Sequence, residues 1–181
     1  METLVVSDHV CLEALKLSMA QDVFSAIDKN RDFLRTWLPF VDFTLELSDT
    51  VLFIQSITAQ KESRKKDEIF GIFVDGEFGG LIGFKDTDWI NRKTEIGYWL
   101  IKEMQGKGII TSCVGKLISY SFQKLKLNRI QIKVAVGNTK SAAIPRRLGF
   151  QFEGIERAGE RHNNKFFDLE VFSLLRSDNK V

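Results

Sequence analysis

The stretch that decides the fold is MQGKGIIT, residues Met104–Thr111, in which two glycines bracket a lysine ahead of an apolar helical pattern. The residues before it, RKTEIGYWLI at 92–101, are rich in β-branched and aromatic side chains and predict a strand. A strand that passes through a glycine turn into a helix leaves the first helical N–H groups unpaired, which suits an anion. Taken alone, however, a GxG pattern more often marks a plain turn.

Two common nucleotide motifs do not fit this stretch. A nucleotide-binding lysine loop needs Ser or Thr after the lysine, whereas Lys107 is followed by Gly108. A dinucleotide fingerprint needs a third glycine where Thr111 stands. Two possibilities stay open, a plain turn and a cradle in which Gly106 and Gly108 would let phosphate oxygens approach the backbone and Lys107 would add charge.

Hydrophobic periodicity extends the prediction along the chain. Strands are expected at 9–15, 69–74, 77–86, 93–101 and 129–136, with two more joined around His162–Asn164. Helices are expected at 18–29 with Ser18 as cap, near 33–38, at 48–63 with Ser48 as cap, at 108–126 and at 140–148. This order, with an antiparallel hairpin at Asp75-Gly76, predicts one mixed α/β domain over residues 1–181.

Composition narrows the class of protein. The net charge of the 181 residues is only +2, with acidic and basic residues interleaved, so no field for nucleic acid is expected. Two cysteines and two histidines without ligand spacing predict no metal site and a reducing, cytoplasmic setting. No apolar run approaches the roughly 20 residues of a membrane span.

A second segment resembles the first in its setting. NTKSAAIPRRLGF, residues 138–150, follows the alternating strand RIQIKVAV at 129–136 and predicts another helix start. Two strand ends beside two helix starts can hold a long ligand between the strands, with its phosphates at the first helix.

On these motifs, Thr94–Phe150 resembles the core of the GNAT superfamily of acetyl-CoA-dependent N-acetyltransferases. The phosphate motif Q/R-x-x-G-x-G/A is met by Gln105 and Gly108, with Ile110 where Gly or Ala is usual. RTWLPF, EIGYWL and NTKS…LGF resemble the branch that acetylates N-terminal Ser and Ala of ribosomal proteins. The resemblance implies a mainly antiparallel central sheet with helices on both faces and a splayed strand pair that holds acetyl-CoA.

The resemblance also implies a set of cofactor contacts. Backbone groups of the strand end would pair with pantetheine, N–H groups of the loop would hold the pyrophosphate, Asn138 would bond pantetheine and Ser141 would lie near the thioester sulfur. Lys107 and Arg146 or Arg147 would meet the outer phosphate. The full set is Trp99, Leu100, Ile101, Gln105, Gly106, Lys107, Gly108, Ile109, Ile110, Thr111, Asn138, Ser141 and Arg146.

The reaction also needs an acid and a base. A base must take a proton from the ammonium so that a neutral amine can attack the thioester, and an acid gives a proton to the departing thiolate. The tyrosine that many family members use as acid is replaced by Pro145, so we expect Ser141, one turn after Asn138, to be the acid; its alternative role is a helix cap. Glu95 is the expected base; the alternative role of Glu95 is that of a surface ion-pair partner of Arg92 or Lys93. His162 could replace it, but RHNN is typical of an exposed hairpin tip.

We therefore expect a cytoplasmic N-acetyltransferase that moves acetyl directly to the N-terminal α-amine of a protein, with a ribosomal protein as the implied substrate. Two alternatives stay open: acetylation of a polyamine or aminoglycoside, and a CoA-binding sensor that has lost the chemistry, which Pro145 motivates. No metal, nucleic acid or membrane partner is expected. An edge strand or exposed aromatic patch would allow a homodimer.

Overall fold

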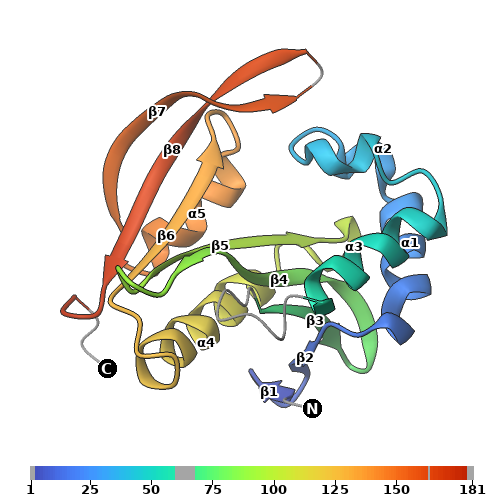
Figure 1. Cartoon of the computed structure of the whole chain (residues 1–181), viewed down its shortest axis with the longest axis horizontal. Coiled ribbons are helices and arrows are strands. Elements are labelled where there is room, and N and C mark those ends of the chain that lie inside the picture. The colour runs from blue at the N-terminus through green and yellow to red at the C-terminus, as the bar shows by residue number, and fades with distance from the viewer. Residues whose placement is uncertain (1–2, 60–67, 163, 179–181) are drawn as a thin grey trace.

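The computed structural model describes residues 3–59, 68–162 and 164–178. Among these residues, eight strands form one open sheet in the order β1-β2-β3-β4-β5-β6-β8-β7 (Figure 1). The strands are β1 Thr3–Val5, β2 Val10–Ala14, β3 Ile69–Val74, β4 Glu77–Asp88, β5 Lys93–Leu100, β6 Arg129–Ala135, β7 Gln151–His162 and β8 Lys165–Leu175.

Helices cover both faces of this sheet. On one face lie η1 Leu17–Met19, α1 Ala20–Lys29, α2 Arg31–Leu34, η2 Pro39–Asp42 and α3 Leu47–Ala59. The short turn η4 Lys102–Met104 leads into α4 Ile109–Gln123, and α5 Thr139–Arg147 follows β6. The alternation of strand side chains explains the two faces: Leu81 and Trp99 pack with α1 and α3, whereas Ile82 and Leu100 pack with α4.

The pairing of β5 with β6 is the feature that positions the site. It is the parallel pair of the sheet, and its register is confined to Lys93–Glu95 against Arg129–Gln131. From Ile96 onward β5 stays paired with β4 but no longer with β6, so the two strands diverge. The mixed, mainly antiparallel sheet with a splayed strand pair and helices on both faces is thereby confirmed.

Several local predictions were wrong. Strand β1 was missed, and neither Ser18 nor Ser48 caps a helix. A 3-10 turn precedes α1, whose N-cap has no side-chain bond. Ser48 lies inside α3, where the Asp49 carboxylate reaches back to accept from the backbone N–H groups of Leu45 and Glu46, both at 2.8 Å. The predicted end of this helix, 60–63, lies outside the described residues.

Neither a membrane-spanning helix nor a metal-binding cluster is found in the described residues. No helix in the described ranges is long and apolar enough to cross a membrane. In the same ranges, no group of three or more His, Cys, Asp or Glu side chains is placed to hold a metal ion.

Candidate active site

A pocket opens where β5 and β6 diverge. Its floor comes from β5 and β6, one wall from the start of α5, and its other walls from β7 and the Trp37–Leu38 segment after α2. In Figure 1 the long β7–β8 hairpin rises on one side of this region and α2 on the other, with β5 running between them. Residues from distant parts of the chain therefore meet at the splay.

The glycine loop lies at the end of β5 and forms the N-terminus of α4. Gly106 and Gly108 have φ of 75° and 76°, and no atom lies within 4 Å of a Cβ built on either. Gly108 is the N-cap of α4 and no side chain bonds to the cap. Because glycine has no side chain to cap the helix, the first N–H groups of this 15-residue helix have no acceptor from the N-cap residue, and the loop suits an anion such as a pyrophosphate.

The isoleucines of this loop do not crowd that space. Ile109 is buried, and Ile110 packs against the core formed by the sheet and α4. Lys107 is exposed beside the two glycines. The bulky residue at 110, where the family motif has Gly or Ala, is accommodated by the protein interior.

The end of β5 is held by bonds within the chain. The Ile101 N–H donates to Gly79 O at 2.8 Å, and its carbonyl accepts from Met104 N–H at 3.3 Å. Gln105 Nε2 donates to Leu100 O at 3.3 Å. The Trp99 side chain is buried on the face of α1 and α3, so only its backbone faces the splay.

The two arginines of α5 have different surroundings. Arg146 pairs with Glu170 at 2.8 Å and lies over the Phe172 ring, both on β8. Arg147 donates to Thr111 Oγ1 at 3.0 Å, in the first turn of α4. Arg147 is therefore the arginine that reaches the phosphate loop, and Arg146, the residue favoured from the sequence, does not.

Asn138 and Ser141 are brought together at the start of α5. Asn138 is the N-cap, and its Oδ1 accepts from the Ser141 N–H at 3.2 Å. The cap role considered for Ser141 thus belongs to Asn138. The Ser141 hydroxyl lines the pocket and lies 3.2 Å from the hydroxyl of Tyr98, a residue to which the sequence analysis gave no role.

Glu95 also lines the pocket, but it is engaged on both sides. It is 7% exposed, its Oε1 lies 2.7 Å from Lys85 Nζ, and its Oε2 accepts from Gln131 Nε2 at 3.2 Å. Both partners are its cross-strand neighbours in the sheet. The ion-pair partner is Lys85, not Arg92 or Lys93.

A second carboxylate in the pocket was missed. Glu160, on β7, lines the same cavity, and no ion pair to it is found among the described residues. Burial raises the pKa of Glu160, against the opposing charges of Lys85 and His162. A carboxyl group with a raised pKa in a pocket is suited to proton transfer near neutral pH.

His162 is not at an exposed hairpin tip as predicted. It is 6% exposed at the end of β7, with Nε2 3.4 Å from Asp42 Oδ2 on η2. Asp42 also binds Arg35 at 2.7 Å. The two strands end where they were predicted to, at His162 and Lys165, but His162 packs against η2 and is buried.

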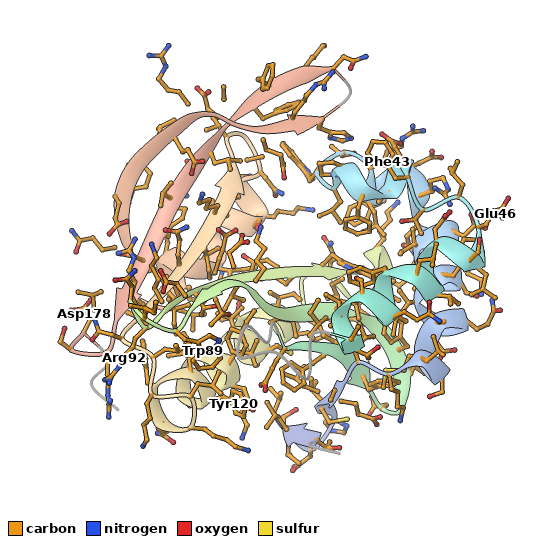
Figure 2. The ribbon with its side chains drawn as sticks, in the orientation of Figure 1. Phe43, Glu46, Trp89, Arg92, Tyr120 and Asp178 are labelled. Atoms are coloured by element: carbon orange, nitrogen blue, oxygen red, sulfur yellow. The ribbon has the colours of Figure 1, made fainter. Side chains whose placement is uncertain are left out.

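Cys113, Asp168 and Trp89 do not line the pocket. Cys113 is fully buried in α4, and burial raises the pKa of its thiol to about 12, which leaves no thiolate nucleophile near neutral pH. Asp168 Oδ1 accepts from the Ala158 N–H on β7 at 2.8 Å. Trp89 is 37% exposed in the β4–β5 turn, which also carries Arg92 (Figure 2).

Comparison with known proteins gives one family. The family model of the acetyltransferase (GNAT) domain matches residues 9–151. The putative ribosomal N-acetyltransferase YdaF of Bacillus subtilis is 38% identical, over 98% of this chain and 97% of its own length. The ribosomal-protein-serine acetyltransferase of Escherichia coli is 31% identical, over 96% of this chain and 97% of its own length.

A solved structure agrees with the sequence relatives. The ribosomal L7/L12 α-N-protein acetyltransferase RimL in complex with coenzyme A superposes with a TM-score of 0.92 at 25% identity. The match covers 98% of this chain and all of that one.

Proposed function

The chain belongs to the GNAT family of acetyltransferases, and from that premise we propose that it moves acetyl from acetyl-CoA to the N-terminal α-amine of a protein. The observation that carries the proposal is the continuity of one pocket. It joins the splay of β5 and β6 to Ser141 on one side and to Glu160 on the other. A thioester in the splay would therefore meet a hydroxyl donor and a carboxylate acceptor in the same space.

Acetyl-CoA supplies an activated acetyl thioester, and the chain supplies its binding. We propose that the free N–H groups at the start of α4 hold the pyrophosphate, and that Arg147 and Lys107 meet its charge. The unpaired edge of β5 would pair with the amides of pantetheine, as would the side-chain amide of Asn138, whose Oδ1 already bonds Ser141.

Glu160 is our proposed base. An amine arrives as an ammonium ion, which Glu160 and Glu95 attract, and one proton must leave before its nitrogen can attack the thioester carbonyl. Burial favours the neutral form of Glu160, so its carboxylate readily takes this proton. Glu95 is the alternative base, but Lys85 and Gln131 already occupy both of its oxygens.

Ser141 serves the other end of the reaction. As the C–S bond breaks, its hydroxyl donates a hydrogen bond to the sulfur, and the proton that the thiolate finally takes passes through this hydroxyl from water. Atoms and charge balance when both nitrogen protons are counted: the ammonium loses one proton to Glu160 before the attack, and the nitrogen loses a second as the tetrahedral intermediate collapses to the amide. The thiolate gains one proton, so the products are the amide, the CoA thiol and one proton released to water. Ser141 replaces the tyrosine for which Pro145 leaves no place.

The acceptor class rests on the relatives, two of which are named for ribosomal proteins. We propose a ribosomal protein N-terminus, modified in the cytoplasm. A polyamine or aminoglycoside is the second candidate, because Asp86, Glu95 and Glu160 line the pocket and would attract a polycation.

One assay separates these functions. Thiol release from acetyl-CoA is followed with peptides beginning in Ser, Ala, Met or Pro, with the same peptides blocked at the N-terminus, and with spermidine and an aminoglycoside. We expect turnover with free Ser or Ala N-termini and none with blocked ones. Faster turnover with spermidine transfers the function to polyamines, and tight CoA binding without any turnover indicates a sensor.

Replacing Ser141 by alanine tests the acid. We expect kcat to fall about a hundredfold, the lower end of the range for one acid–base group, while KM for acetyl-CoA stays within about twofold. Ser119→Ala on α4, whose hydroxyl donates to Gly115 O within the same helix, is the matched control and should leave kcat unchanged. An unchanged kcat in Ser141→Ala removes Ser141 from the reaction.

A further inference from the structure

Helix α5 contains a proline in its interior. Pro145 is the seventh residue of the helix Thr139–Arg147 and is buried. In an α-helix the N–H of residue 145 would donate to the carbonyl of residue 141. Proline has no N–H, so the Ser141 carbonyl is left without its helical donor, while the neighbouring Asn138 carbonyl still accepts from Ala142 at 3.0 Å.

The missing donor comes from another element. The Tyr98 hydroxyl, on β5, donates to Ser141 O at 3.3 Å and lies 3.2 Å from Ser141 Oγ. A phenol has one proton, so when it goes to the carbonyl the phenol oxygen is left to accept from the Ser141 hydroxyl. Tyr98 thus contacts both oxygens of Ser141.

The contact also crosses the splay. Tyr98 lies on β5 beyond Glu95, where β5 has parted from β6, and Ser141 lies on the helix that follows β6. The bond between them spans the two sides of the pocket. Burial raises the pKa of Tyr98 to about 12, so the phenol keeps its proton and remains a donor throughout the ordinary assay range.

We propose that Tyr98 is a positioning residue for acetyl transfer, required because Pro145 removes the helix donor of the Ser141 carbonyl. Tyr98 holds Ser141 with its hydroxyl toward the pocket until the sulfur of the thioester takes the place of the phenol oxygen as its acceptor. Tyr98 transfers no proton itself. The proposal rests on the role of Ser141 in the proposed function.

The test is a double-mutant cycle between the phenol and the proline. Tyr98→Phe removes the hydroxyl and keeps the ring, and Pro145→Ala returns an N–H to the helix four residues after Ser141. We expect Tyr98→Phe to lower kcat about tenfold in the Pro145 background, and less than about threefold when combined with Pro145→Ala, because the restored amide replaces the lost donor. KM for acetyl-CoA should stay within about twofold in each variant, since Ser141 would act on the departing sulfur and not on the bound phosphates.

The other tyrosine of the chain gives the matched control. Tyr120 on α4 donates to Glu68 at 2.8 Å, on the opposite side of β5 from the β7–β8 hairpin in Figure 2. Tyr120→Phe should leave kcat unchanged in both backgrounds at position 145. The four variants of the cycle are also compared by free energy of unfolding, which needs no turnover.

The effects of the variants on kcat and on the free energy of unfolding are read together. Coupling between Tyr98→Phe and Pro145→Ala in kcat, with or without coupling in stability, supports the proposal. Coupling in stability with additive effects on kcat makes the bond structural only and overturns it, as do additive effects in both. Absence of turnover in the unmutated protein contradicts the proposed function instead, and is established before the cycle is read.

Discussion

Replacing Glu160 by glutamine should lower kcat about a hundredfold or more, within the range for loss of a general base. Glutamine has nearly the same size as glutamate and can still form hydrogen bonds, but its amide cannot take a proton at neutral pH. KM for acetyl-CoA should change little, because Glu160 lies on β7 while the phosphate loop lies at the end of β5. The measurement is steady-state thiol release with the best peptide acceptor.

The pH dependence sharpens this prediction. The base works as carboxylate, so kcat/KM of the unmutated enzyme should rise with pH as Glu160 loses its proton. Because burial raises the pKa of Glu160, this rise should lie above the ordinary range of a glutamate. The Glu160→Gln enzyme should lack this part of the profile.

Glu160→Gln should raise the stability of the protein although it lowers the activity. The folded protein holds the Glu160 proton more tightly than the unfolded chain does, so the charge costs folding free energy once the pH exceeds the unfolded pKa. Glu160→Gln should therefore raise the unfolding temperature at neutral pH, and the gain should vanish in acid. Glu95→Gln is the comparison: if it abolishes turnover while Glu160→Gln remains active, Glu95 is the base.

Replacing Gly108 by valine should raise the dissociation constant for acetyl-CoA about tenfold to a hundredfold. Gly108 has φ of 76°, where a β-branched residue is strained by about 1–3 kcal/mol. Relief of this strain turns the N–H groups at the start of α4 away from the pyrophosphate, and the new side chain enters space that is open in the structure. Calorimetric titration with acetyl-CoA measures the loss.

Gly115 provides the control for this substitution. It lies inside α4 with no φ in the left-handed region and no atom within 4 Å of a built Cβ. Gly115→Val should therefore fold and bind acetyl-CoA normally, because valine is no worse than glycine in a helix interior. Normal affinity in Gly108→Val would mean that the loop does not hold the phosphates.

The backbone that would bind acetyl-CoA could be predicted from the sequence, because its conformation depends on residues close together in the chain. Glycines at 106 and 108 after an apolar strand required a turn with positive φ, and the helical spacing that follows required α4. The pairing of Asn138 with Ser141 likewise follows from their separation by one turn. Such features need only the chain within a few residues of itself.

The acceptor side could not be predicted because it depends on contacts between distant segments. The register of β7 shifts between Glu156 and Glu160, with Ala158 at φ of 51°, so alternation along the strand does not show that Glu160 faces the pocket. His162 was assigned to an exposed loop because the turn residues do not show that this end of the hairpin packs against Asp42, which lies 120 positions earlier in the chain. Tyr98 gained its role only through Pro145, 47 positions further along the chain.

The three paired positions between β5 and β6 have a consequence for the energetics of the whole molecule. Inside a sheet, the backbone N–H and C=O groups of neighbouring strands normally bond to each other. Here β5 and β6 part in the middle of the sheet, and a ligand with amides of its own can complete their hydrogen bonds. Ligand occupancy and fold stability then become linked quantities, and binding at a hundred times the dissociation constant adds about 2.7 kcal/mol to the free energy of unfolding. The protein should be most resistant to heat, proteolysis and amide exchange while acetyl-CoA is bound. The concentration of acetyl-CoA would then affect both how long the folded protein persists and how fast it turns over.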